Sequence, residues 1–149
     1  MPDVNFSEQA RRTLARAREE AVDLHHPYVG TEHMLLALLR ESEGVASDVL
    51  KSFAVEVTTM RQVLLGNVEK GSSVHPMGTE LPYTSRAKRA LELGMWQSHE
   101  WAHQYIGNEH MLIGLLREKS GIAAQVLVDA GVTLDGALAQ TLSLVAKPR

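Results

Sequence analysis

The stretch YVGTEHMLLALLRE, residues 28–41, occurs again in slightly altered form as YIGNEHMLIGLLRE, residues 105–118. The same offset of 77 positions aligns residues on both sides of the two copies without a gap. The aligned pairs are Phe6-Ser7 with Tyr83-Thr84, Ala10 with Ala87, Arg12 with Arg89, Leu14 with Leu91, His26 with His103, Gly44 with Gly121, and Val49-Leu50 with Val126-Leu127. Repetition at a fixed period predicts two similar structural units.

A helical period runs through both units. Small and apolar residues recur three or four positions apart from Ala10 to Leu24, with Ser7 placed as an N-cap, and Thr84 precedes the corresponding run in the second unit. The duplicated motif predicts a second helix, capped by Thr31 or Asn108 and burying its leucines. Further short helices are predicted at residues 45–51, 57–65, 122–129 and 134–144, and no segment alternates as a strand does.

We therefore predict an all-α fold of about eight helices, arranged as two four-helix repeats related by a pseudo-twofold axis. Residues 1–149 form one domain in this interpretation, with repeat one at 6–65, a linker at 66–82 and repeat two at 83–144. The linker prediction depends on the stretch GNVEKGSSVHPMGTELP, which is dense in Gly, Ser and Pro and has neither a helical nor a strand period.

Composition excludes several classes of protein. The chain has 149 residues and no cysteine, so disulfides and thiolate zinc sites are ruled out. At 44% apolar and 22% charged residues it has a globular composition, without an apolar run long enough to span a bilayer or a secretory signal at its start. The net charge of −3 argues against a grip on nucleic acid. We expect a cytoplasmic protein with neither a membrane nor a nucleic acid as partner.

Glu32 and Glu109 are the candidate site residues that chemistry singles out. A carboxylate in the first turn of a helix is stabilised by the helix dipole, typically by about 0.3–1 kcal/mol, and this alone accounts for their presence. The same geometry also suits a ligand, because free backbone N–H groups at a helix start bind an anion and a neighbouring carboxylate binds a guanidinium. Both interpretations stay open from the residues alone.

The histidines favour structure over catalysis. His33 and His110, each directly after a candidate glutamate, are predicted to be partly buried and hydrogen-bonded. His99 and His103 are spaced four apart, which places both imidazoles on one helix face, but no third metal ligand can be identified. A small helical metal-dependent enzyme using this pair is the alternative hypothesis, and a scaffold without a ligand is a third.

Motifs for catalysis are absent from the sequence. It contains no G-x-S-x-G, no G-x-x-x-x-G-K-[ST] and no cysteine nucleophile. We therefore predict no catalytic residue, no metal and no cofactor.

The doubled GTEH/GNEH and MLLALLRE/MLIGLLRE, together with EGVA/SGIA and YTSRAKRALELG, resemble the Clp repeat domain. That domain is the N-terminal domain of the Clp-type AAA+ unfoldases, and the resemblance is closest to the ClpC branch. It covers about Phe6 to about Leu144. The resemblance implies a non-catalytic module that recruits substrates and adaptor proteins to an ATP-driven unfolding ring.

In ClpC-type domains each repeat carries a pocket for phosphorylated arginine. The resemblance thus implies that Glu32 and Glu109 bind the guanidinium of arginine-phosphorylated clients. For the phosphate it points to polar residues at adjacent helix starts, paired within each half: Ser7 with Thr31, and Thr84 with Asn108. Asn108 stands where the family motif has threonine, so the second pocket is predicted to be the weaker one.

The nucleotide-binding modules of a ClpC protein do not follow in this sequence. Two expectations remain open: the chain is a fragment of a larger unfoldase, or it is a free-standing homologue that acts as an adaptor or a sink for ligands of the unfoldase.

Overall fold

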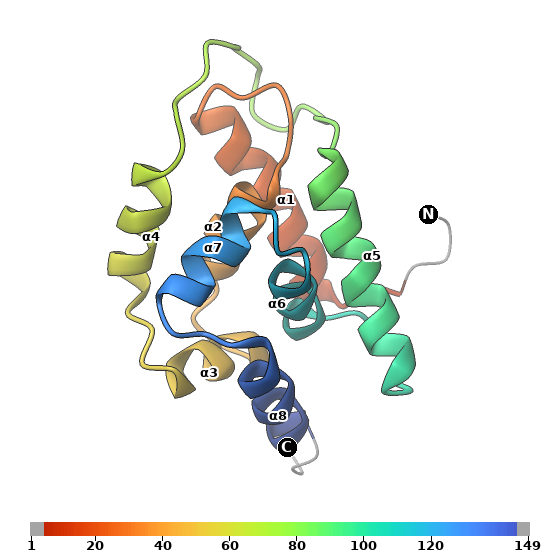
Figure 1. Cartoon of the computed structure of the whole chain (residues 1–149). Helices are drawn as coiled ribbons and strands as arrows, with labels where there is room; N and C mark the ends of the chain where they lie inside the picture. Colours follow the sequence, from red (N-terminus) through yellow and green to blue (C-terminus); the bar gives the residue numbers. More distant parts are fainter. Residues whose placement is uncertain (1–4, 146–149) are drawn as a thin grey trace.

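The computed structural model describes residues 5–145, which form eight α-helices (Figure 1). The helices are α1 (Glu8–Asp23), α2 (Thr31–Arg40), α3 (Val45–Ser52), α4 (Val57–Gly66), α5 (Ser85–Glu100), α6 (Asn108–Arg117), α7 (Ile122–Asp129) and α8 (Leu134–Val145). Over these residues the only β-type pairings are two single-residue bridges. The prediction of an all-α fold with four helices in each half is confirmed.

The long helices begin where the sequence predicts them to begin. The Ser7 hydroxyl oxygen accepts a hydrogen bond from the Ala10 N–H at 3.0 Å, and the Thr84 hydroxyl oxygen accepts one from the Ala87 N–H at 3.1 Å. Each cap satisfies a donor that the first turn of a helix leaves free.

Each β-bridge joins the segment before the first helix of one half to the segment before the second helix of the other half. Phe6 pairs with Ile106, directly before α6, and Tyr83 pairs with Val29, directly before α2. The hydrogen bonds repeat across the pseudo-twofold axis: the Ser7 N–H donates to the Ile106 carbonyl at 3.0 Å, and the Thr84 N–H donates to the Val29 carbonyl at 2.9 Å. The first helix of each half therefore starts beside the duplicated motif of the other half.

The duplicated motif forms the centre of the core. Every residue of α2 from Thr31 to Leu39, and of α6 from Asn108 to Leu116, is buried. The prediction that the motif leucines are core residues is confirmed, since the most exposed of them, Leu39, retains 5% of its surface.

A glycine allows α5 and α6 to pack in close contact. A Cβ at Gly114 would lie 2.0 Å from the Ala90 carbonyl oxygen, well inside any allowed contact. Its counterpart in α2 is Ala37, so the same helix in the first half carries the extra methyl group.

Residues 67–84 connect α4 to α5 without forming a helix, and they pass over the end of α1 (Figure 1). The Gly71 N–H donates to the Leu24 carbonyl at 2.8 Å, and the Ser73 N–H donates to the His25 carbonyl at 3.0 Å. We propose 6–65 and 83–144 as the two repeats and 66–82 as the linker, because this division places four helices on each side.

No single helix between residues 5 and 145 has both the length and the apolar composition to cross a bilayer. Together α7 and α8 meet those criteria, but they are bent by 84° relative to each other.

Candidate ligand-binding site

Glu32 lies in a cavity of about 360 Å³ built from both halves of the chain, which we call the Glu32 pocket. Its lining residues are Tyr28, Thr31 and Glu32 from the first half, and Thr84, Ser85, Arg86, Gly121 and Ile122 from the second. The exchanged β-bridges create this arrangement, because the Thr84 N–H bonded to Val29 brings the start of α5 next to the start of α2.

The Glu32 carboxylate is almost buried, with 8% of the residue exposed, and it folds back over Gly30. A Cβ at Gly30 would lie 2.3 Å from Glu32 Oε1, so any larger residue would displace the carboxylate. Over residues 5–145 neither a hydrogen bond nor an ion pair holds this carboxylate. A carboxylate that lines a cavity without a partner is free to accept hydrogen bonds from a cationic ligand.

The start of α5, which also lines the Glu32 pocket, favours an anion. The first N–H groups of α5 have no intrahelical acceptor, and the helix dipole adds partial positive charge there. The exposed Arg86 lines the pocket at this helix start. One cavity thus contains both a carboxylate and a positively charged helix start.

Thr31 has a structural contact in this pocket. Its hydroxyl oxygen accepts from the Ala123 N–H at the start of α7, at a long distance of 3.4 Å. The hydroxyl hydrogen is not used by that contact, so Thr31 can still donate to a ligand.

The Glu109 site is the pseudo-twofold equivalent, and its polar groups differ. Glu109 is 5% exposed, and Oε2 of its carboxylate accepts a hydrogen bond from the Tyr105 hydroxyl at 2.5 Å. Asn108 is 1% exposed, and its side-chain oxygen and nitrogen have no hydrogen-bond partner within residues 5–145. The Ser7 N–H bonds to the Ile106 carbonyl, which places the α1 start on this side.

The α1 start lacks the positive charge of the α5 start. Glu8 and Gln9 occupy the positions equivalent to Ser85 and Arg86. Gln9 Nε2 donates to the Glu43 carbonyl at 2.8 Å, so this side chain already bridges to the loop before α3. The Glu109 site therefore has one more negative charge and one less positive charge than the Glu32 pocket.

The predicted grouping of phosphate residues within each half was wrong. Thr84 lines the Glu32 pocket, and the Ser7 N–H bonds to the Ile106 carbonyl in the segment before α6, which carries Glu109. Each predicted glutamate is therefore combined with the helix cap of the other half. Arg86, which no sequence motif singled out, joins the candidate site.

The duplicated histidines form hydrogen-bonded pairs in which His33 and His110 are buried, as predicted, and His103 is half-buried. His33 Nδ1 accepts from the Gly30 N–H at 2.8 Å, and its Nε2 lies 2.7 Å from His26 Nδ1. Since His26 Nε2 lies 2.6 Å from the Glu69 carbonyl, it must carry the proton, and His33 must then donate to His26. The chain of bonds requires both rings to be neutral.

Burial lowers the pKa of His33 to about 3 and that of His110 to about 4. His33 also replaces the predicted cap. The helix begins with Gly30 as its N-cap, and the His33 ring satisfies the Gly30 N–H, whereas Thr31 is the first helical residue. His110 does the same for Gly107 at 2.9 Å, so the predicted capping by Thr31 and Asn108 was wrong.

His99 and His103 do not lie on one helix face, contrary to the spacing argument. The helix α5 ends at Glu100, and Ala102 adopts a left-handed conformation with φ of 54°, which turns the chain before His103. His103 instead pairs with His110, its Nδ1 lying 2.8 Å from His110 Nε2. Between residues 5 and 145 no three His, Cys, Asp or Glu side chains gather in a way that could hold a metal ion.

Comparisons with known proteins place the fold and the sequence in one family. The model of the Clp repeat (R) N-terminal domain matches residues 5–96 and 97–148. The chain is 43% identical over 141 residues to the chaperone protein ClpB of Oceanobacillus iheyensis, and 40% identical over 140 residues to the negative regulator of genetic competence ClpC/MecB of Bacillus subtilis. Each match covers 94% of this chain and 17% of the relative.

Solved structures show the same fold. The Hsp104 N-terminal domain from Candida albicans superposes with a TM-score of 0.77 at 19% identity, over 97% of this chain and 94% of that one. The ClpV N-domain in complex with a VipB peptide gives a TM-score of 0.71 at 18% identity, over 97% and 91%. The chain spans about a sixth of the length of the curated relatives it matches. It belongs to the Clp repeat N-terminal domain family.

Proposed function

We propose that this domain recognises client and adaptor proteins for a Clp-type AAA+ unfoldase in the cytoplasm and catalyses no reaction itself. Family membership and 40% identity to a ClpC protein support the proposal. The related ClpV N-domain has been solved in complex with a VipB peptide, which is the kind of contact we propose here. The same binding chemistry serves a domain attached to an unfoldase and a free-standing adaptor or sink.

The ligand that we propose for the Glu32 pocket is a phosphorylated arginine side chain. Glu32 would accept two parallel hydrogen bonds from the guanidinium, and the start of α5 with Thr84 and Arg86 would bind the phosphoryl group. Thr31 would donate to a phosphoryl oxygen. The observation that carries this proposal is that Glu32, which is 8% exposed and has no hydrogen-bond or ion-pair partner among residues 5–145, lines the same cavity as the positive start of α5.

The Glu109 site would bind the same ligand more weakly. Glu109 would hold the guanidinium there, with Ser7 and Asn108 near the phosphoryl group. A ligand must compete with the Tyr105 hydroxyl for Glu109, and Glu8 repels a phosphoryl group that Arg86 would attract.

Isothermal titration calorimetry with free phosphoarginine tests this proposal on the whole chain. Wild-type protein should show one dominant site. Glu32→Gln keeps the shape of the side chain but removes the charge, and the loss of a charge-assisted hydrogen bond of about 1.5–3 kcal/mol predicts a tenfold or larger drop in affinity. Arg86→Gln should weaken binding of phosphoarginine but not of free arginine.

Glu92→Gln is the matched control, since Glu92 is exposed on α5 away from the pocket lining. Absence of saturable binding, or equal affinity of the wild-type and Glu32→Gln proteins, would remove the phosphoarginine proposal. Adaptor docking would then need another surface.

A separate experiment tests why the Glu109 site should bind phosphoarginine more weakly than the Glu32 pocket. The double variant Glu8→Ser, Gln9→Arg gives the Glu109 site the two residues that begin α5 in the Glu32 pocket, while Asn108 and the Tyr105 contact stay as they are. Its titration should show a higher affinity at the Glu109 site and a smaller difference between the two sites. An unchanged affinity at the Glu109 site would mean that these two residues do not contribute to the difference.

A further inference from the structure

The pseudo-twofold axis relates the contact between α3 and α8 to the contact between α4 and α7. The offset of 77 places Ala130, after α7, at the position of Phe53, after α3. It likewise places Gly136 of α8 at the position of Thr59 of α4. The two contacts are therefore built alike except at these two positions, where Phe53 and Gly136 in one contact correspond to Ala130 and Thr59 in the other.

The Phe53 ring fills the space between α3 and α8. It is half-buried against the core, and its edge rests on Gly136, where a Cβ would lie 2.7 Å from Cζ of the ring. A Cβ at this position of α8 would displace the ring, so Gly136 leaves the room that the ring occupies.

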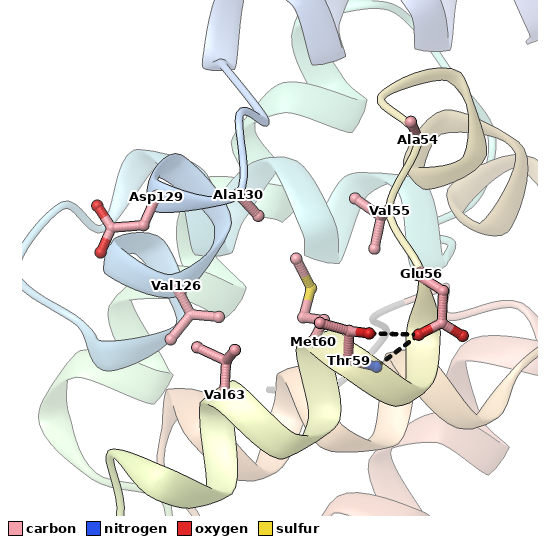
Figure 2. Close-up of a pocket in the computed structure, with 9 residues that line it drawn as sticks. All are labelled: Ala54, Val55, Glu56, Thr59, Met60, Val63, Val126, Asp129 and Ala130. Carbon is pink, nitrogen blue, oxygen red and sulfur yellow. Dashed lines mark hydrogen bonds between the residues drawn. The ribbon is translucent and has the colours of Figure 1, made fainter.

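Between α4 and α7 the corresponding space is open. A cavity of about 310 Å³ lies there, lined by the apolar side chains of Ala54, Val55, Met60, Val63, Val126 and Ala130 (Figure 2). We call it the α4–α7 groove. Figure 2 shows the Met60 side chain directed into the groove between Val55 and Val126, and Val63 at its side remains 46% exposed.

Two carboxylates lie on opposite rims of the groove, Glu56 at the start of α4 and Asp129 at the end of α7 (Figure 2). The Glu56 carboxylate is held by the N–H and the hydroxyl of Thr59, both at 2.7 Å. Both acids are exposed, and in the described part of the chain no cation forms an ion pair with either of them. The groove is thus apolar inside and negative at its edges.

We propose that the α4–α7 groove binds an aromatic side chain of phenylalanine type from an extended client segment in which lysine or arginine flanks the aromatic residue. The choice of occupant rests on Phe53, which fills the corresponding space in the other half; in the groove, Thr59 stands where that half has Gly136, and its hydroxyl is held by Glu56. Met60 is a suitable contact for the ring, because thioethers pack favourably against aromatic edges. The flanking cations pair with Glu56 and Asp129.

The α4–α7 groove and the Glu32 pocket share no lining residue. They lie at opposite ends of α7, where Ile122 lines the Glu32 pocket and Asp129 lines the groove. We therefore expect a substitution in one site to leave binding at the other unchanged, so the two proposals can fail independently.

A fluorescein-labelled peptide of sequence Gly-Lys-Lys-Phe-Lys-Lys-Gly tests the proposal by fluorescence anisotropy on the whole chain. Replacement of Phe by Ala in the peptide should weaken binding at least tenfold, and replacement of the lysines by glutamates should abolish it. In methyl NMR spectra the peptide should shift the signals of Met60, Val63 and Val126.

Ala130→Phe places in the groove the ring that the other half carries. This variant should lose the peptide while retaining the wild-type affinity for phosphoarginine. Asp129→Lys reverses the charge of one rim without touching the apolar lining, and it should weaken the peptide several-fold. Glu92→Lys, the same charge change on exposed α5, should bind as wild type does.

Several results would overturn the proposal. These are equal affinity for the Phe and Ala peptides, unchanged peptide binding by a folded Ala130→Phe protein, or equal effects of Asp129→Lys and Glu92→Lys. NMR shifts confined to residues outside the groove would also overturn it.

Discussion

A single methyl group at Gly114 should destabilise the fold through the contact between α5 and α6. In Gly114→Ala the new Cβ would lie 2.0 Å from the Ala90 carbonyl oxygen and 2.9 Å from the Gly94 nitrogen. Ordinary contacts of this kind start near 3.4 Å, so α6 has to move by more than 1 Å relative to α5. Both obstructing atoms belong to the backbone of a helix, which cannot turn aside as a side chain can.

The magnitude follows from two opposing effects. Overpacking in a well-packed core costs typically about 1–3 kcal/mol, and a backbone obstacle belongs at the upper end of that range. Alanine is better than glycine in a helix by about 1 kcal/mol. The net loss should be about 2 kcal/mol, which lowers the melting temperature of a chain of this size by about 4–8 °C.

Circular dichroism at 222 nm during heating measures the effect. The matched control is Gly66→Ala at the end of α4, where an added Cβ meets no atom within 4 Å, so its melting temperature should stay the same or rise slightly. A Gly114→Ala protein that melts at or above the wild-type temperature would refute the reasoning, because the helices would then have room that the structure does not show.

Arg61 donates two hydrogen bonds, at 3.0 and 3.1 Å, to the buried carboxylate of Glu20, so Arg61→Ala should lower the free energy of unfolding in urea by about 1.5–3 kcal/mol. Arg12→Ala, which removes an exposed side chain with a 3.8 Å ion pair, should cost less than about 1 kcal/mol, and similar losses in the two variants would contradict this account. Burial lowers the pKa of His33 to about 3, so between pH 6.5 and about pH 3 the unfolded chain binds a proton that the folded protein does not. The contribution of His33 to stability is therefore complete above pH 6.5 and falls by up to about 1.4 kcal/mol per pH unit down to about pH 3. His33→Gln should flatten the decline of the melting temperature between pH 6 and 4, and a decline as steep as that of wild type or of the exposed His99→Gln protein would show that His33 is not its cause.

The helices could be predicted well because their signals are local. The expected helix at residues 122–129 is observed at Ile122–Asp129, and the one expected at 57–65 is observed at Val57–Gly66. Apolar spacing and the caps Ser7 and Thr84 act within a few residues, so no knowledge of the other half is needed.

The composition of the candidate site could not be predicted, because it depends on contacts between the halves. The offset of 77 identifies Ser7 and Thr84 as equivalent residues, but it does not say whether a cap faces the motif of its own half or of the other. The β-bridges decide this, and each consists of a single residue pair without a periodic signature.

Two further features of the structure could not be predicted because they depend on backbone conformation and on side-chain volume. The left-handed turn at Ala102 places His103 beyond the end of α5, and alanine carries no strong signal for such a turn. The exchange of Phe53 for Ala130 is visible in the alignment of the halves, but it indicates a groove only once α4 and α7 are known to be neighbours.

The pairing of segments between the halves limits what a single repeat could do. A polypeptide of half this length would supply the glutamate of a candidate site but not the helix start that lines the site from the other half. It could complete the candidate site only as a homodimer, and the two sites of that dimer would be identical. When both repeats lie in one chain, the two sites can differ, as the exchange of Arg86 for Gln9 shows. One polypeptide can thereby carry two related candidate sites that differ in charge.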